Sequence, residues 1–110
     1  TFCPIADFDL VKHAAEECEK LGVHFMVGNI LSSDTFYDDA NSGMEWAKMG
    51  VLGVEMESAA LYCNAARAGK KALCICTVSD SFVYPEENTT AEERQTSFTK
   101  MMEVALEIAE

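Results

Sequence analysis

Two carboxylates stand one residue apart, at Glu55 and Glu57, in the segment GVLGVEMESAALY, with Met56 between them. The segment begins apolar and β-prone and ends in small residues that suit a helix. A carboxylate at a helix N-terminus is stabilised, typically by about 0.3–1 kcal/mol, so it stays ionised and accepts hydrogen bonds. Two such acceptors beside a soft methionine suit a ligand with adjacent hydroxyls, such as those of a ribose. The alternative is that Glu57 caps the helix and Glu55 faces solvent.

A second pair of chemically useful residues is Asp80, which closes the apolar segment KALCICTVSD, and Arg94, in the first turn of a predicted final helix. An Asp at a partly dry sheet edge can hold or deliver a proton near neutral pH, because burial favours the neutral carboxyl. A cation in a first helical turn opposes the helix dipole, so helix stability does not explain Arg94. The alternatives are an Asp that starts a turn and a surface Arg paired with Glu92 or Glu93.

Two aromatic residues, Phe36 and Tyr37, lie in the polar, turn-rich segment SSDTFYDDANSG. A loop of this length without its own secondary structure usually indicates function or mobility. The two rings can stack on a planar ligand. They can equally anchor the loop by packing into the core.

The elements that must position these residues alternate between helix and strand. Apolar periodicity predicts helices that end at residue 21 and that span 44–50, 58–69 and 91–110, and strands over 23–31, 51–55 and 71–80. This alternation favours an α/β sandwich around a largely parallel sheet. Ligands gather at the carboxyl ends of such strands, so the ends at Ser32 to Asp34, Glu55 to Glu57, and Ser79-Asp80 can converge on one site.

Capping signals and apolar spacing define the first and last helices. Asp7 or Asp9 can begin the first helix and Gly22 stops it; Thr89 or Thr90 can begin the last through a capping box. The predicted buried face of the first helix is Phe8, Val11, Ala15, Cys18 and Leu21. That of the last is Phe98, Met101, Met102, Val104, Ala105 and Ile108.

Composition narrows the classes of function. The chain has 110 residues, the size of one domain, and a net charge of −11 from nineteen acids and eight basic residues. Binding to nucleic acid needs basic patches, so we expect no nucleic-acid partner. No apolar run approaches the roughly 20 residues that span a bilayer, so we expect no membrane partner. The chain starts with Thr1 rather than Met, which predicts a fragment or a processed product.

Five cysteines, an odd number with no CxxC pair, predict buried free thiols in a reducing compartment and hence a cytoplasmic protein. Cys74 and Cys76 are two residues apart in an apolar run, which places them on one face of a strand. The two histidines, His13 and His24, are isolated from other ligand types. We therefore expect no metal site.

Four segments occur together and in order: FMVGNILSSDTFY, GVLGVEMESAALY, CTVSD and TTAEERQTSF. Together they resemble the C-terminal half of the hexameric, bacterial-type purine nucleoside phosphorylases, across almost the whole of residues 1–110. The resemblance implies a three-layer α/β sandwich around a central mixed, largely parallel sheet, of which this chain is the C-terminal portion. It also implies purine salvage by reversible phosphorolysis of purine (deoxy)ribonucleosides, with phosphate as co-substrate, no cofactor, and a homo-oligomer, a dimer-based hexamer.

The resemblance also implies a role for each candidate residue. Glu57 would bind the ribose hydroxyls and Phe36 would pack on the purine. Asp80 would protonate N7 of the base, helped by Arg94. The remaining residues, which would line the sugar and base pockets, are Val54, Glu55, Met56 and Ser79.

Two departures from the family pattern bear on function. The family commonly has a His and a basic residue after the Asp, whereas here the segment from Ser81 to Tyr84 is more apolar. The phosphate-gripping residues of the family's N-terminal half are absent, so we expect this polypeptide alone to be inactive. Within the superfamily, a uridine or methylthioadenosine enzyme is the alternative. Outside it, the alternative is a non-catalytic module that binds a nucleoside or only oligomerises.

Overall fold

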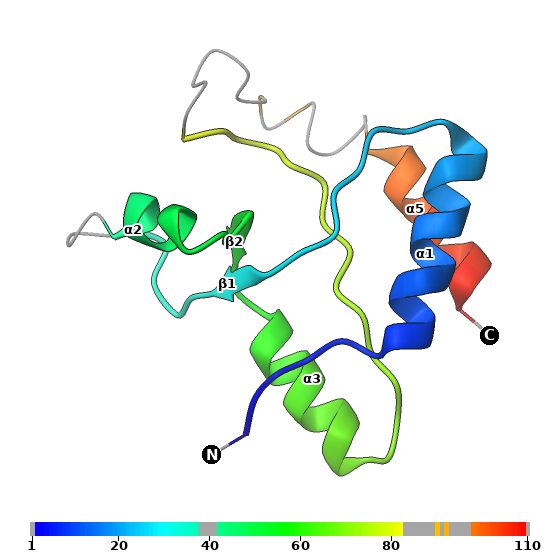
Figure 1. Cartoon of the computed structure of the whole chain (residues 1–110), viewed down its shortest axis with the longest axis horizontal. Helices are drawn as coiled ribbons and strands as arrows, with labels where there is room; N and C mark the ends of the chain where they lie inside the picture. Colours follow the sequence, from blue (N-terminus) through cyan, green and yellow to red (C-terminus); the bar gives the residue numbers. More distant parts are fainter. Residues whose placement is uncertain (1, 38–41, 83–89, 91, 93–97, 110) are drawn as a thin grey trace. The chain divides into compact units, whose positions relative to one another are not determined.

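The computed structural model describes residues 2–37, 42–82, 90, 92 and 98–109 (Figure 1). The chain divides into two compact units: Thr1–Val11 with Met26–Cys74, and Lys12–Phe25 with Ile75–Glu110. The elements are α1 (Phe8–Leu21), β1 (Ile30–Ser32), α2 (Gly43–Lys48), β2 (Gly53–Glu55), α3 (Ser58–Arg67) and α5 (Thr99–Ile108).

Local chemistry sets both ends of α1. The carboxylate of Asp7 accepts a 3.0 Å hydrogen bond from the backbone N–H of Leu10, so Asp7 is the capping residue. At the other end Gly22 has φ +69°, a left-handed conformation that glycine adopts at little cost. The N–H groups of Gly22 and Val23 donate back into the last turn, at 3.1 and 3.3 Å, in a Schellman arrangement. The predicted start and stop of this helix are confirmed.

The helices α2 and α3 also follow the predicted segments closely. Gly69, with φ +67°, ends α3 as expected, and its N–H donates to the carbonyl of Ala66 at 3.1 Å. The next N–H, of Lys70, donates to the carbonyl of Ala65 at 2.8 Å, which completes a second Schellman arrangement.

The sheet consists of β1 and β2, paired in parallel with Ile30 opposite Gly53 and Ser32 opposite Glu55. The pairing confirms the α/β class and the parallel arrangement. The first strand is shorter than predicted, because only its last residues lie opposite β2. Side chains of Met26 and Val27, inside the predicted strand, are 64% and 61% exposed.

The prediction of a strand over 71–80 is wrong for this structure. In the described part of the chain these residues belong to no ladder, and they run as an extended trace after α3 (Figure 1). Apolar alternation identifies an extended segment, but a strand also needs a hydrogen-bonded partner. Within this segment, the backbone N–H of Cys74 donates to the hydroxyl of Tyr62, a residue of α3, at 2.9 Å.

Burial within the described residues is limited. The buried hydrophobic side chains are Ala14 of α1 and Val104 of α5. On α5, Met101, Val104 and Ile108 face inward, whereas Met102 and Ala105, predicted to do so, are exposed. Phe8, predicted to be buried, is 75% exposed, because it lies in the first turn of α1.

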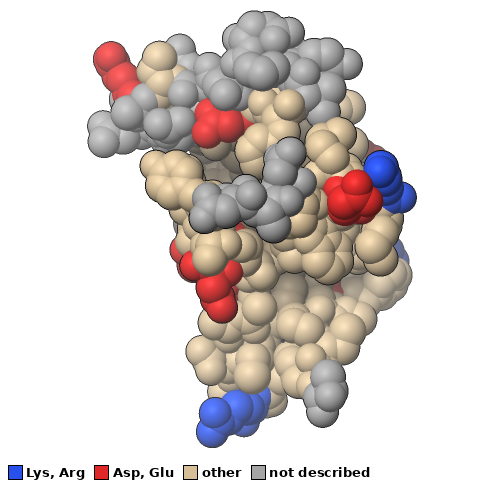
Figure 2. Space-filling model, turned by 90° about the vertical axis from the view of Figure 1, so that its left-hand side faces the viewer, with Lys and Arg blue, Asp and Glu red and all other residues tan. Residues whose placement is uncertain are grey.

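Many large apolar side chains remain accessible, and side chains that are neither acidic nor basic cover most of the face in Figure 2. None of the five cysteines, all of which the structure describes, forms a disulfide, but Cys3 and Cys76 are exposed, so the prediction of burial is wrong for them. Burial raises the pKa of the Cys18 thiol. Among the described helices, none has the length and apolarity needed to cross a membrane.

Candidate functional site at the β2–α3 junction

The turn from β2 into α3 is closed by the carboxylate of Glu55. Its Oε2 atom accepts hydrogen bonds from the backbone N–H groups of Glu57 and Ser58, each at 2.7 Å. Its Oε1 atom accepts a hydrogen bond from the Ser58 hydroxyl. The first N–H groups of a helix lack partners within the helix, so this carboxylate satisfies two groups that need an acceptor.

A residue from the neighbouring strand completes the same turn. The Ser32 hydroxyl oxygen accepts a 3.2 Å hydrogen bond from the backbone N–H of Ala59. The backbone N–H of Ser33 donates to the carbonyl of Glu55 at 2.8 Å. Because Ser32 and Glu55 are partners in the parallel ladder, their side chains leave the sheet together and meet the start of α3. Three of the first four N–H groups of this helix are therefore satisfied from the strand ends.

The charge state of Glu55 follows from these contacts. Its burial, the largest single influence, raises the pKa of the carboxyl. Hydrogen bonds from the Ser58 hydroxyl, from the backbone N–H groups of Glu57 and Ser58, and from Ser32 together outweigh burial, so the pKa of Glu55 lies below its ordinary value. Glu55 is thus an ionised acceptor that is committed to protein donors.

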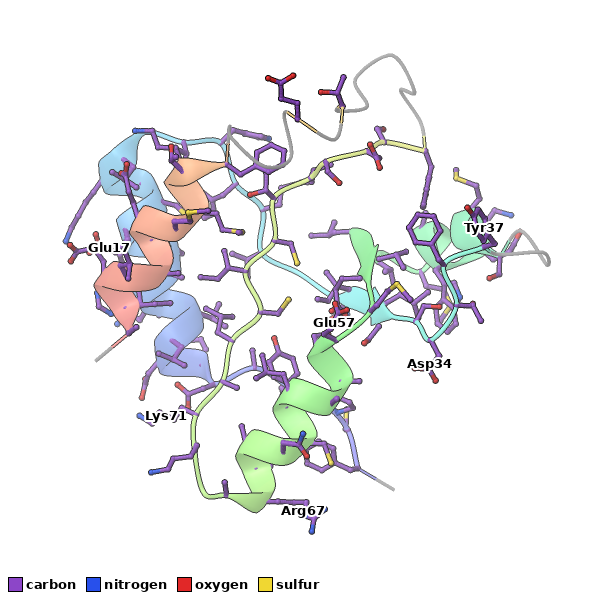
Figure 3. All side chains as sticks on the ribbon, turned by 180° about the vertical axis from the view of Figure 1, so that it is seen from behind. Glu17, Asp34, Tyr37, Glu57, Arg67 and Lys71 are labelled. Atoms are coloured by element: carbon purple, nitrogen blue, oxygen red, sulfur yellow. The ribbon has the colours of Figure 1, made fainter. Side chains whose placement is uncertain are left out.

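Glu57 differs from Glu55 although it stands only two residues away. It occupies the N-cap position of α3, but its side chain makes no capping hydrogen bond, and the residue is exposed. Figure 3 shows Glu57 at the point where the strand turns into the helix. The structural alternative, with Glu57 as the cap and Glu55 in solvent, is the reverse of what is found. The Glu57 carboxylate can accept hydrogen bonds from a ligand.

Apolar surface adjoins Glu57 on the same stretch of chain. Val54 and Met56 are 45% and 40% exposed, so both can contact a ligand at this junction. Phe36 and Tyr37, in the loop after β1, are 77% and 81% exposed. Their rings make an edge-to-face contact with centroids 5.1 Å apart and an interplanar angle of 82°. The core-anchor interpretation of this pair is wrong, because both rings face solvent.

The other predicted site residues belong to a different part of the chain. Ser79 is half-buried and Asp80 is exposed, and both lie in the second compact unit. The expected partly dry surroundings of Asp80 are not found, because the segment that carries it joins no ladder among the described residues. Arg94 lies outside the described residues, and so does one member of each predicted capping box, Thr89 in one and Glu93 in the other. The convergence of Asp80 with Glu57 therefore stays a prediction.

The sequence places Ser32 at a strand end that can converge with Glu55, which the ladder confirms, but it did not predict the contact of Ser32 with the start of α3, and Ser58 was missed. The signal for Ser58 was present, since a Ser at the first position of a small-residue helix, three residues after a Glu, can hydrogen-bond that Glu. No local signal identifies Ser32, which lies 27 residues before the backbone N–H that it accepts from.

One cavity in the first unit lies apart from the junction. It has a volume of about 260 Å³ and is lined by residues that include Phe2, Ile5, Tyr62, Ala65 and Lys70. None of the predicted site residues lines it. No group of three or more potential metal ligands is found in the described part of the chain.

The parallel β1–β2 pair, the helix that begins directly at a strand end, and the two acids at that junction define an α/β protein with a strand-end site. A family model described as the phosphorylase superfamily matches residues 1–110, so the chain belongs to that superfamily.

Three named relatives are similar to this chain. It is 56% identical to the "Purine nucleoside phosphorylase DeoD-type" of Clostridium novyi (strain NT) over 110 residues, which are 99% of this chain and 47% of that protein. It is 54% identical to the protein of that name from Thermoanaerobacter sp. (strain X514), over 99% of this chain and 47% of that protein. For Bacillus subtilis (strain 168) the identity is 53%, over 96% of this chain and 45% of that protein. The resemblance predicted from the motifs is confirmed, and the chain spans about half the length of the relatives it matches.

Proposed function

We propose that this chain is the nucleoside-binding half of a purine nucleoside phosphorylase. The complete domain would catalyse reversible phosphorolysis of purine (deoxy)ribonucleosides to the free base and (deoxy)ribose 1-phosphate, as a step of purine salvage. The observation that carries the proposal is the junction itself. One acid, Glu55, holds the turn, while the other, Glu57, is exposed beside apolar side chains and makes no capping bond in the part of the chain that the structure describes. The identity to proteins named purine nucleoside phosphorylase supports the choice of substrate.

Each residue has a proposed role in binding. The Glu57 carboxylate accepts hydrogen bonds from the ribose hydroxyls, which is the chemistry for which an exposed carboxylate is suited. Val54 and Met56 line the sugar and base pocket with apolar surface. Phe36 packs on the purine ring, which an exposed aromatic face at a strand end can do. Ser79 shapes the base site.

The proposed reaction replaces one bond to C1′ by another. As the bond from C1′ to N9 breaks, its electron pair leaves with the purine, and Asp80 donates a proton to N7. A phosphate oxygen bonds to C1′ on the sugar, which has oxocarbenium character, and the proton that phosphate loses restores the acid. Arg94 approaches Asp80 when the last helix closes and promotes the proton transfer. No metal or cofactor takes part.

Phosphate binding falls to residues outside this chain. The described residues contain no glycine-rich anion loop, and the chain holds only two arginines, Arg67 and Arg94. We therefore propose that the 110-residue chain alone is inactive. The active form would be a cytoplasmic homo-oligomer, a dimer-based hexamer, that contains the whole domain.

The test is a substrate panel with two proteins. A complete phosphorylase domain containing these 110 residues is assayed with inosine, adenosine, uridine and methylthioadenosine, with phosphate present and withheld. We expect release of purine base from inosine or adenosine only with phosphate, and no turnover by the 110-residue chain. Preferred cleavage of uridine, or cleavage of methylthioadenosine without phosphate, would assign a different activity within the superfamily. Turnover by the 110-residue chain at the rate of the complete domain would contradict the two-part site.

A further inference from the structure

The position of the Glu57 carboxylate depends on how the backbone turns between β2 and α3. Glu57 has φ −126° and ψ −21°, and its side chain makes no capping bond, so nothing local holds it. The backbone N–H of Glu57 is instead held at 2.7 Å by the carboxylate two residues before it. The direction in which Glu57 leaves the turn is therefore set by Glu55.

Glu55 is in turn held from the neighbouring strand. Ser32 lies opposite it in the ladder, and its hydroxyl oxygen accepts the N–H of Ala59 from the second position of α3. The backbone N–H of Ser33 donates to the carbonyl of Glu55, at 2.8 Å. The end of β1 is thus joined both to the end of β2 and to the start of α3. Three elements joined at one point leave the intervening turn little freedom.

The geometry points to Ser32 and Glu55 as positioning residues that fix the turn and so present the Glu57 carboxylate to the sugar hydroxyls. This inference rests on the function proposed above. It corrects the prediction that Glu55 lines the pocket, because the Glu55 carboxylate oxygens accept hydrogen bonds from Glu57 and Ser58. Glu55 acts through Glu57 rather than on the substrate.

The turn itself can be tested in the 110-residue chain without any activity. Amide hydrogen exchange at Ala59 reports the bond to the Ser32 hydroxyl. Loss of a net hydrogen bond of about 1 kcal/mol corresponds to roughly fivefold faster exchange, so Ser32→Ala should speed exchange at Ala59 about fivefold. Ser32→Thr restores the hydroxyl and should restore slow exchange.

Ser33→Ala is the matched control for the exchange measurement. The Ser33 hydroxyl donates to the carbonyl of Thr35 at 3.0 Å and does not reach α3. Exchange at Ala59 should therefore be unchanged in Ser33→Ala. Equal exchange rates at Ala59 in Ser32→Ala and in the unmodified chain would overturn the inference.

A double-mutant cycle in the complete phosphorylase domain tests the consequence for catalysis. Ser32→Ala and Glu55→Gln should each raise KM for inosine several-fold while lowering kcat less. If the residues act through Glu57, adding Ser32→Ala to Glu57→Ala should change KM by less than twofold. If Ser32 and Glu55 only stabilise the fold, the effects of Ser32→Ala and Glu57→Ala on KM will be additive. Additive effects would overturn the inference.

The two proposals fail in different ways. If the complete domain shows no phosphorolysis but amide exchange at Ala59 is fast in Ser32→Ala, the proposed function is refuted and the role of Ser32 in holding the turn is supported. Phosphorolysis with additive effects of Ser32→Ala and Glu57→Ala would retain the function and refute the positioning role. A third result would also refute the positioning role. If Glu55→Gln loses binding of inosine but keeps binding of a nucleoside without sugar hydroxyls, and Ser32→Ala binds both normally, then Glu55 contacts the sugar directly.

Discussion

The carboxylate of Glu55 accepts a 2.7 Å hydrogen bond from the backbone N–H of Ser58 and a second hydrogen bond from the hydroxyl of the same residue. A strand-end acid and the first residue of the following helix are thereby locked together. This relationship divides two similar acids into two roles. Glu55 maintains the turn, and Glu57 is available to a ligand.

The two roles predict different losses of stability when each acid is replaced by alanine. Glu55→Ala leaves two backbone N–H groups and the Ser58 hydroxyl without their acceptor, so the free energy of unfolding should fall by about 2 kcal/mol. Glu57→Ala removes an exposed side chain that makes no capping bond, so stability should change by less than about 0.5 kcal/mol. Urea unfolding of both variants, followed by circular dichroism, makes the comparison. A larger loss for Glu57→Ala would contradict the assignment.

The lowered pKa of Glu55 predicts a pH dependence of stability. A carboxyl whose pKa is lower in the folded state stabilises the fold at pH values above its ordinary pKa of 4.5. That contribution is lost as the pH falls through the lowered value, because the protonated group no longer accepts from all of its donors. The free energy of unfolding should therefore decrease on acidification below about pH 4.5.

Glu55→Gln serves as the control for this pH effect. The variant cannot titrate at this position, so its unfolding free energy should decline less steeply over the same acid range. Urea titrations at a series of pH values measure both slopes. Identical slopes for Glu55→Gln and the unmodified chain would show that other carboxyls account for the acid response.

Gly69 should tolerate a side chain poorly. Its φ of +67° is a left-handed conformation that costs a residue with a Cβ roughly 1–2 kcal/mol, although space is open around the position. Gly69→Ala should therefore lower stability by about 1 kcal/mol. Gly53→Ala is the matched control, because a Cβ at Gly53 also meets nothing within 4 Å and its φ lies outside the left-handed range. The midpoint temperature of thermal unfolding should be higher for Gly53→Ala than for Gly69→Ala. The reverse order would contradict the argument from the backbone angle of Gly69.

Asp80 should be needed for turnover rather than for folding. In the complete domain, Asp80→Ala removes the proposed proton donor to N7, so kcat for inosine should fall about 100-fold or more, in the range typical of general acids. Asp9→Ala removes the same charge from an exposed ion pair with Lys71, 3.7 Å away, and should leave kcat unchanged. Steady-state kinetics with phosphate present measures both. Unchanged kcat in Asp80→Ala would remove Asp80 from the mechanism.

What could be predicted from the sequence was local or was carried by motifs. The cap at Asp7 and the stops at Gly22 and Gly69 follow from hydrogen bonds and backbone angles that span only a few residues. The superfamily followed from short segments in a fixed order, which the family match confirms. The identity of the helix cap did not follow, because both Glu57, directly before α3, and Glu55, three residues before it, are within reach of its first N–H groups.

Only the tertiary structure assigned the roles of the two acids. Glu55 closes the turn through its bonds to Glu57 and Ser58, and the parallel register sets Ser32 opposite it. No local sequence pattern encodes the contact of Ser32 with Ala59, which spans 27 residues. The same reason explains why the prediction of a strand over residues 71–80 is wrong. Apolar alternation determines that a segment is extended, whereas its pairing depends on which other strand lies beside it. Hydrogen bonds between neighbouring residues can be predicted from the local sequence. The pairing of strands in a ladder, and the turn that the ladder positions, depend on residues far apart in the chain.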